Sequence, residues 1–331
     1  MVQLIEADVN VIADLRRKLI SPDTKLSEKY RVLFSLRNVK NQEAQDALLE
    51  ALKDNSALFR HDVAFCLGQR QDASSIATLT KILHDESEHA MVRHEAGEAL
   101  GAIGTPECLE PLKEHEFDPV QEVAETCQLA LQRIRYYEEH PEVTDSESPF
   151  YSVDPTPAYP VSTPVSELEA IYLDEKKSMF ERYRALFSLR NKGPRDSAAV
   201  AALCRVFSSS SALLKHEVAY VMGQLLSAKT VSTLMDVLSD NSQHAMVRHE
   251  AAEALGAIAD PKSIAMLETF AKDVEPIVAD SCIVALDMLE FEQSGGFEYA
   301  DKGGETQGEE KARDENKMTA AQMMCPCKWE K

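Results

Sequence analysis

The octapeptide His89-Ala-Met-Val-Arg-His-Glu-Ala96 occurs a second time, without a change, at His244-Ala-Met-Val-Arg-His-Glu-Ala251, 155 residues later. A looser form has its histidine 33 residues before the second histidine of each copy. These looser stretches are Leu58-Phe-Arg-His-Asp-Val-Ala-Phe65 and Leu213-Leu-Lys-His-Glu-Val-Ala-Tyr220. Four His-acid pairs therefore occupy equivalent points of a duplicated unit, and such an internal repeat is the first clue to the fold.

The duplication extends well beyond the histidines. Lys29-Tyr-Arg-Val-Leu-Phe-Ser-Leu-Arg-Asn38 matches Arg182-Tyr-Arg-Ala-Leu-Phe-Ser-Leu-Arg-Asn191, and Glu98–Ile103 matches Glu253–Ile258. Within each half, apolar residues recur at spacings of three and four, which indicates helices. We expect eight short helices per half, starting in the first half near residues 6, 25, 44, 57, 73, 88, 106 and 119. The sequence predicts an all-α solenoid of HEAT-like helix pairs, in two pseudo-symmetric halves of about four repeats each.

The predicted boundaries follow from composition. Residues 1–137 form the first half, 164–292 the second, and 138–163 a Pro-rich, acidic linker between them. As a random coil, the linker would span on the order of 28 Å, which lets the second half fold back and face the first. Residues 293–331 are rich in Gly, Glu and Lys and predict a disordered tail. Cys325 and Cys327 in that tail are expected to be free thiols, because no second Cys pair stands at zinc-binding spacing.

Charge and hydropathy exclude several classes of protein. The net charge is −21, whereas nucleic-acid binding demands basic patches. No apolar run approaches the roughly 18 residues that span a bilayer. We expect a monomer that binds neither nucleic acid nor membranes, in the cytoplasm or alternatively in the nucleus. A cationic partner would suit the acidic surface, although such a charge also serves solubility.

The His-acid pairs fall into two groups. His84 and His115 are not repeated in the second half, so they are expected on the surface. His89 and His244 also recur, five residues before His94 and His249. Five residues turn a helix by about 140°, so these side chains leave the helix face that bears the ligands, and we expect them to play a supporting role. The remaining four histidines recur inside apolar helices. They either form hydrogen bonds between neighbouring repeats or bind metal.

Metal binding is the interpretation that uses all four recurring pairs. Imidazole with carboxylate is a ligand set for iron, zinc and manganese, and the lack of thiolates argues against structural zinc. One half would supply its ligands to one ion and the other half to a second, and facing halves would bring the ions together. The predicted ligands are His61, His94 and Glu95 for the first ion and His216, His249 and Glu250 for the second.

Glycine and methionine also recur beside the histidines. Each of the four histidines is followed seven residues later by Gly, among them Gly68 and Gly223. Two helical turns place Gly on the histidine face, where either a ligand approaches the backbone or neighbouring helices crowd. Met91 and Met246 lie three residues before a histidine on the same face. They either fill the core or line an apolar channel beside the metals.

With these motifs, the chain resembles the deoxyhypusine hydroxylase family over about residues 25–290. The resemblance implies a non-haem di-iron monooxygenase with two Fe(II) ions, O2 as co-substrate and an external electron donor. Its substrate would be the deoxyhypusine side chain, a lysine extended by an aminobutyl group, on translation initiation factor 5A. The resemblance assigns the irons to the two ligand sets named above.

The resemblance leaves two acids with an open role. Asp62 and Glu217 would contact the substrate ammonium groups, support the ligands, or serve as additional ligands. The chain departs from the family pattern at Asp62, where Glu is usual, and the shorter side chain loses roughly 1.5 Å of reach. If Asp62 only contacts substrate, activity should survive this change.

Two other functions compete with the hydroxylase. A HEAT-repeat adaptor would bind a protein on its concave face and contain no metal. A hydrolase or lyase would hold zinc and would not depend on O2. Metal content and O2 dependence separate the three hypotheses.

Overall fold

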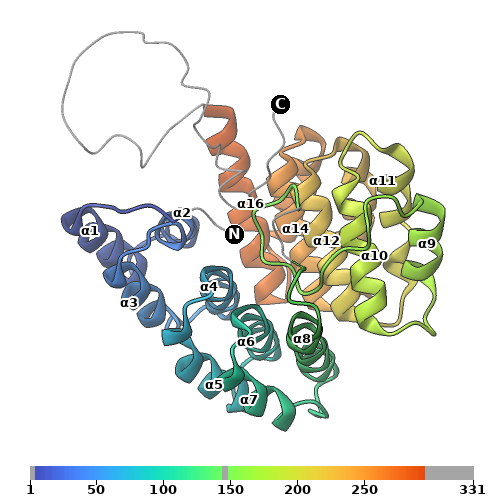
Figure 1. The fold of residues 1–331 in the computed structure, drawn as a ribbon. Coiled ribbons are helices and arrows are strands. Elements are labelled where there is room, and N and C mark those ends of the chain that lie inside the picture. Colours follow the sequence, from blue (N-terminus) through green and yellow to red (C-terminus); the bar gives the residue numbers. More distant parts are fainter. Residues whose placement is uncertain (1–3, 144–147, 295–331) are drawn as a thin grey trace, which may run out of the picture.

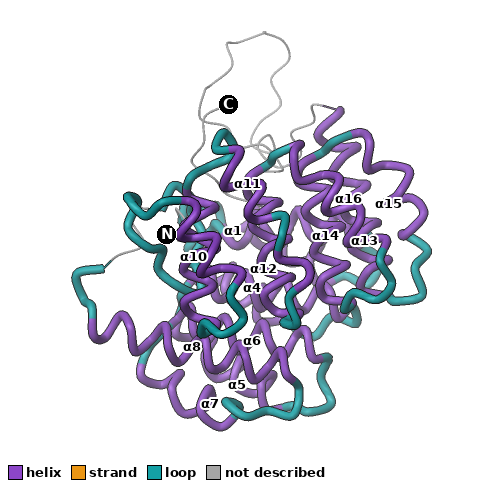
Figure 2. The backbone as a smooth tube through the Cα atoms, turned by 90° about the vertical axis from the view of Figure 1, so that its right-hand side faces the viewer, coloured by secondary structure: helices purple, strands orange, loops and turns teal. Residues whose placement is uncertain are grey.

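The computed structural model describes residues 4–143 and 148–294, and this part of the chain is built of helices (Figures 1 and 2). An isolated bridge pairs Ile5 with Val39. Each half has eight α-helices, as the sequence predicts, and the all-α solenoid is confirmed. The first half comprises α1 (Val9–Ile20), α2 (Leu26–Arg37), α3 (Gln42–Ala51), α4 (Ala57–Arg70), α5 (Ile76–His84), α6 (Ala90–Ile103), α7 (Leu109–Glu114) and α8 (Gln121–Glu139). The second half comprises α9 (Val165–Leu173), α10 (Met179–Asn191), α11 (Ser197–Leu203), α12 (Ala212–Leu225), α13 (Val231–Ser239), α14 (Ala245–Ile258), α15 (Ile264–Phe270) and α16 (Pro276–Ser294).

The helices form an inner and an outer layer. In Figure 1 the even-numbered helices of both halves surround the centre, and α1, α3, α5 and α7 flank the first half on its outer side. Successive inner helices pack against one another, as α4 does on α6 and α12 on α14. The two halves close on each other at both ends, because α16 contacts α2 and α4 while α8 contacts α10 and α12. The histidine-bearing helices therefore face one another.

Side chains at the helix N-termini fix where the inner helices begin. Ser56 caps α4 by accepting from Phe59 N, and Ser211 caps α12 by accepting from Leu214 N. His89 and His244 cap α6 and α14, each accepting a hydrogen bond from the backbone N–H two residues on. A capping side chain satisfies a helix N–H that has no partner within the helix. The supporting role expected for His89 and His244 is thus a capping role.

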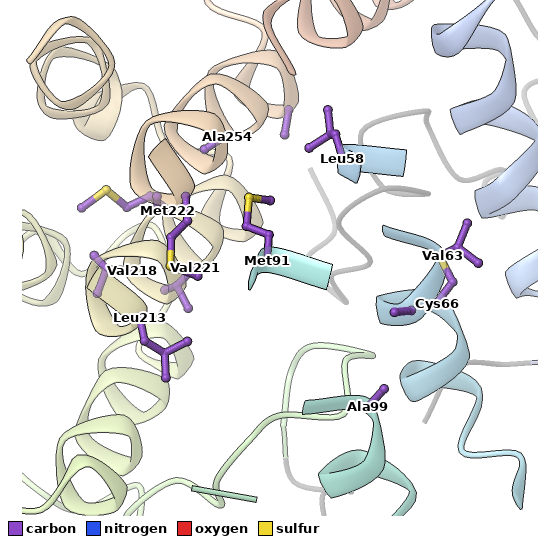
Figure 3. Packing of buried hydrophobic residues seen from close by; sticks show 14 of the residues in the cluster. Leu58, Val63, Cys66, Met91, Ala99, Leu213, Val218, Val221, Met222 and Ala254 are labelled. Atoms are coloured by element: carbon purple, nitrogen blue, oxygen red, sulfur yellow. The ribbon is translucent and has the colours of Figure 1, made fainter. Parts of the chain in front are cut away.

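Apolar side chains of both halves join in one core. Figure 3 shows part of it, with side chains from α4 and α6 of the first half and from α12 and α14 of the second. The residues labelled there include Val63, Cys66, Ala99, Val218, Val221, Met222 and Ala254, each at most 2% exposed. Burial of this apolar surface holds the inner helices together.

Polar contacts across the two seams repeat with the internal symmetry. The Ser56 hydroxyl donates to Asp280 of α16 at 3.2 Å, and the Ser211 hydroxyl donates to Glu125 of α8 at 2.8 Å. Both the serines and the acids are 155 positions apart. The same serine–carboxylate hydrogen bond therefore joins the two halves at both ends, so that the inner helices form a closed ring.

The described part of the predicted extended linker is packed against the protein. Its residues 150–158, here called the strap, lie packed on the inner helices, with Phe150, Val153 and Thr156 at most 4% exposed. Buried side chains of both halves form hydrogen bonds with Ser152, Val153 and Asp154 of the strap, in place of the hydrogen bonds that water would make. These side chains are Gln69, Arg133, Arg190 and Gln224.

Two further expectations concern the ends of the chain. The predicted tail, with Cys325 and Cys327, lies from residue 295 onward outside the described residues. None of the helices described is both long enough and apolar enough to cross a membrane.

Buried arginines tie the inner helices α6 and α14 to their neighbours. Arg93 donates from Nε to the carbonyl of Leu83 at 3.0 Å and pairs with Asp118 at 2.5 Å. Arg248 repeats this arrangement with Leu238 and Asp273. Arg248 and Asp273 have side chains only 7% and 6% exposed. Each arginine immediately precedes a site histidine, so these pairs also hold the histidine helices in place.

We expect Arg248→Met to lower the free energy of unfolding by about 3–5 kcal/mol, because it leaves the Asp273 carboxylate buried without its partner. The matched control is Arg17→Met. Arg17 pairs with Asp14 on the surface, so its loss should change stability by less than about 1 kcal/mol. Denaturant unfolding measures both values, and equal effects would show that burial of the Arg248 pair does not matter.

Candidate metal centre

The four recurring histidines meet at the centre of the ring. His61 comes from α4, His94 from α6, His216 from α12 and His249 from α14. The His61 and His94 rings lie 5.5 Å apart between centroids, and those of His216 and His249 lie 5.2 Å apart. Across the two halves, His61 lies 5.5 Å from His249 and 5.9 Å from His216. The fold thus brings the two predicted ligand sets to one place.

One carboxylate from each half adjoins these rings. Glu95 Oε2 lies 3.3 Å from His61 Nε2, and Glu250 Oε2 lies 3.3 Å from His216 Nε2. Ligand atoms of His61, His94 and Glu95 all lie within 4.8 Å of one another, which suits coordination of one ion. In the second half the same limit encloses His249 and Glu250 together with Glu253, a residue that the sequence analysis did not select.

The imidazoles have no hydrogen-bond partners for the nitrogens that face the centre. Six buried ring nitrogens are without one: Nδ1 and Nε2 of His61 and of His216, and Nε2 of His94 and of His249. Burial, followed by the neighbouring histidines, lowers the pKa of His94 and of His249 well below the ordinary value. These two rings are therefore neutral at neutral pH, which is the form that binds metal. The residues present fit a pair of metal ions.

Asp62 and Glu217 hold equivalent positions but have different surroundings. Asp62 accepts a hydrogen bond from the Tyr30 hydroxyl, and its other oxygen lies 3.5 Å from His61 Nδ1. Tyr183, the counterpart of Tyr30, instead donates to the carbonyl of Leu213 at 3.3 Å. Glu217 is 4% exposed, and the structure gives it no hydrogen bond or ion pair within the described chain. The shorter acid is thus fixed by Tyr30, and the longer one is free to meet a ligand.

A cleft of about 60 Å³ opens onto this cluster. Phe34, Phe65, Tyr220 and Met288 supply much of its apolar wall. No Lys or Arg is among the described residues that line it, so the cleft favours cations. Its six carboxylates belong to Asp62, Glu95, Glu98, Glu217, Glu250 and Glu253.

Sequence reasoning missed two of these acids, Glu98 and Glu253. Each follows a site histidine by four residues, and the two are 155 positions apart, which was the available signal. Glu253 accepts from the Ser281 hydroxyl at 3.0 Å and lies 3.5 Å from His249 Nδ1. Burial raises the pKa of Glu98 and of Glu253, with nearby acids adding to the effect. Cations in the cleft would reverse this effect by stabilising the charged carboxylates.

The glycines beside the histidines are explained by helix packing. A Cβ on Gly68 would lie 2.7 Å from the Cα of Ala99, and a Cβ on Gly223 would lie 3.2 Å from the Cα of Ala254. Helix crowding therefore accounts for both, and Gly68 does not border the cleft. Gly223, in contrast, is crowded by the neighbouring helix and also borders the cleft.

Met91 and Met246 also lie away from the cleft. They are 3% and 1% exposed and belong to the hydrophobic core. Of the two alternatives, the structure supports core filling, because these side chains are buried among the inner helices.

The two histidines expected on the surface lie apart from the centre. His84 is 40% exposed in its side chain and pairs with Glu114 at 3.1 Å. His115 is more buried than expected, since its Nδ1 lies 2.8 Å from Asp118, the partner of Arg93. Neither residue borders the cleft.

Comparisons with known proteins agree with this architecture. Residues 13–89, 46–132 and 200–287 match the HEAT-repeat family. The chain is 51% identical to deoxyhypusine hydroxylase of Arabidopsis thaliana, over 89% of this chain and 95% of that protein. It is 48% identical to deoxyhypusine hydroxylase of Gallus gallus, over 88% of this chain and 96% of that protein.

A solved structure extends the agreement to three dimensions. Human deoxyhypusine hydroxylase in complex with glycerol superposes with a TM-score of 0.81 at 46% identity, covering 85% of this chain and 96% of that one. The identity, the coverage and the shared helical architecture together show that this chain belongs to the deoxyhypusine hydroxylase family.

Proposed function

We propose that this protein is a deoxyhypusine monooxygenase that hydroxylates the deoxyhypusine side chain of translation initiation factor 5A. The observation that carries the proposal is the buried cluster of four imidazoles, two from each half, in which six ring nitrogens lack hydrogen bonds and which adjoins a cleft lined by six carboxylates. The names of the relatives supply the reaction and the substrate.

Two Fe(II) ions would be held by this cluster. His61, His94 and Glu95 would bind one, and His216, His249 and Glu250 would bind the other. Support comes from the chemistry of the donors, since two imidazoles with one carboxylate and open positions are typical of non-haem Fe(II) oxygenases. None of the described cysteines borders the cleft, so thiolate ligation of zinc has no basis here.

When bound, the iron pair would make O2 reactive enough to hydroxylate an unactivated C–H bond, which no side chain can do. One oxygen atom of O2 enters the C–H bond as the hydroxyl group. The other leaves as water, and this requires two electrons from an external donor and two protons.

The protein's own residues would hold and orient the cationic substrate. A carboxylate pairs well with an ammonium group in a site from which water is excluded. Two divalent ions and two ammonium groups carry as many positive charges as the six carboxylates of the cleft carry negative ones. The aromatic rings of Phe65 and Tyr220, whose centroids lie 5.8 Å apart, join the two halves at the cleft and help to exclude water.

Iron content tests the assignment of ligands. We expect about two iron atoms per chain in the native protein and a large loss in His94→Ala and in His249→Ala, because each removes a buried ligand that cannot be replaced. His84→Ala is the matched control and should keep its iron, since His84 is exposed and pairs with Glu114 away from the histidine cluster. Elemental analysis of the purified proteins gives the result. Equal loss in the control, or no iron in the native protein, would contradict the assignment.

Dependence on O2 tests the reaction class. The iron-loaded protein should add one oxygen atom to the deoxyhypusine-bearing factor when O2 and a reductant are present, as measured by the mass of the modified peptide. The zinc-loaded protein should be inactive, because zinc has no redox chemistry. Modification without O2, or with zinc in place of iron, would favour the hydrolase or lyase alternative.

A further inference from the structure

The cleft opens on one side only, although the residues around it come in pseudo-symmetric pairs. It borders Gly223, Ala257 and Met288 but not their counterparts Gly68, Ala102 and Arg133, which precede them by 155 positions. It borders Phe34 but not Phe187, the counterpart of Phe34 in the duplicated stretch. One of two equivalent grooves is therefore open, and the other is filled.

The strap fills the second groove. Arg133, the counterpart of Met288, donates from Nε to the backbone carbonyl of Asp154 at 3.0 Å. Arg190 binds the Asp154 carboxylate from the other half, at 2.8 Å for the Nη1 contact. Gln69 exchanges two hydrogen bonds with the backbone of Val153, at 2.8 and 3.1 Å. Because the linker occurs once in the chain, it covers only one of the two grooves.

The acids beside the strap differ from those beside the opening. On the open side, Asp62 and Glu253 already accept hydrogen bonds from hydroxyl groups of Tyr30 and Ser281. On the strap side, Glu98 and Glu217 make no hydrogen bond or ion pair with any residue of the described chain. Both nevertheless border the cleft, and Glu217 is only 4% exposed.

Glu98 and Glu217 both line the same cleft, one from each half. Burial, the charge of Glu95 and then that of Glu217 raise the pKa of Glu98. Asp154 of the strap contributes in the same direction to Glu98 and to Glu217. The closed end of the cleft therefore contains two carboxyl groups that make no hydrogen bond within the described chain and whose charged form needs a cation beside it.

We infer that the substrate side chain enters in one direction, past Phe34 and Met288, and that Glu98 together with Glu217 holds its terminal ammonium group at the closed end. The methylene groups between the two substrate ammonium groups would then lie over the histidine cluster. The inner ammonium group would lie nearer to Asp62 and Glu253. This inference rests on the proposed function, and it adds Glu98 as a specificity residue and the strap as the element that sets the direction.

Two synthetic peptides of the same sequence test the direction. One carries N-(4-aminobutyl)lysine, and the other carries N-butyllysine, which lacks the terminal ammonium group. Their dissociation constants are measured by calorimetry on the iron-loaded full chain without O2, so that no turnover occurs. Glu98→Gln should weaken binding of the aminobutyl peptide about tenfold or more, because it removes one partner of a buried charge pair. It should leave binding of the butyl peptide unchanged.

Glu253→Gln, the pseudo-symmetric counterpart, is the matched control. Any loss it causes should affect the two peptides alike, because Glu253 lies on the open side. Glu98→Asp keeps the charge with a shorter reach, so it should retain part of the preference for the aminobutyl peptide. Helical content and iron content, measured on each variant, show that the ring and its metal centre are intact.

The outcomes separate this inference from the function on which it rests. A loss specific to the terminal ammonium in Glu253→Gln, or an equal loss for both peptides in Glu98→Gln, would overturn the direction while hydroxylation by the native protein continues. A native protein that neither prefers the aminobutyl peptide nor hydroxylates it would overturn the proposed function, and the direction with it.

Discussion

The burial of four imidazole rings, six of whose ring nitrogens make no hydrogen bond within the described chain, is the constraint on which the rest of this structure depends. A buried polar atom left unsatisfied costs about 1–3 kcal/mol, which is a sizeable part of the net stability of a domain, about 5–15 kcal/mol. A fold that retained this arrangement for packing alone would gain from replacing the histidines by apolar residues. A bound cation that accepts the nitrogen lone pairs removes the cost.

The solenoid architecture meets this constraint by keeping every ligand on a helix whose position is fixed from several sides. Serine and histidine caps set the start of the inner helices. Buried arginines next to His94 and His249 anchor two of those helices to the outer layer. Ser56 and Ser211 close the seams between the halves. Ligands on such rigid elements are held more accurately than ligands on loops, which suits a metal centre.

The sequence predicted the helices and the His-acid ligand sets because both depend on spacing that repeats in one dimension. Glu98 and Glu253 share that spacing, but an acid on a helix is ordinarily solvated, and only the closure of the ring shows that they face inward. Met91 and Met246 share a helix face with the histidines, as predicted. An inner helix is buried on most of its circumference, so the helix face alone did not show whether these side chains fill the core or line a channel. The strap escaped prediction for a different reason. Its Pro-rich composition describes an extended chain, whereas the buried Gln69, Arg133 and Arg190 that bind it are distant in sequence.

The strap also resolves a conflict between the symmetry of the protein and that of its proposed substrate. Duplication of a helical unit produces a site with a pseudo-twofold axis, and such a site offers two equivalent grooves. A side chain attached to a protein at one end and bearing an ammonium group at the other has no such symmetry. A segment present once can make the two grooves different, and the linker between the halves is such a segment. Its contacts with Arg133 and Arg190 fill one groove, while Met288 and Phe34 border the groove that stays open. The difference between Asp62, fixed by Tyr30, and Glu217, left without a partner, follows the same division.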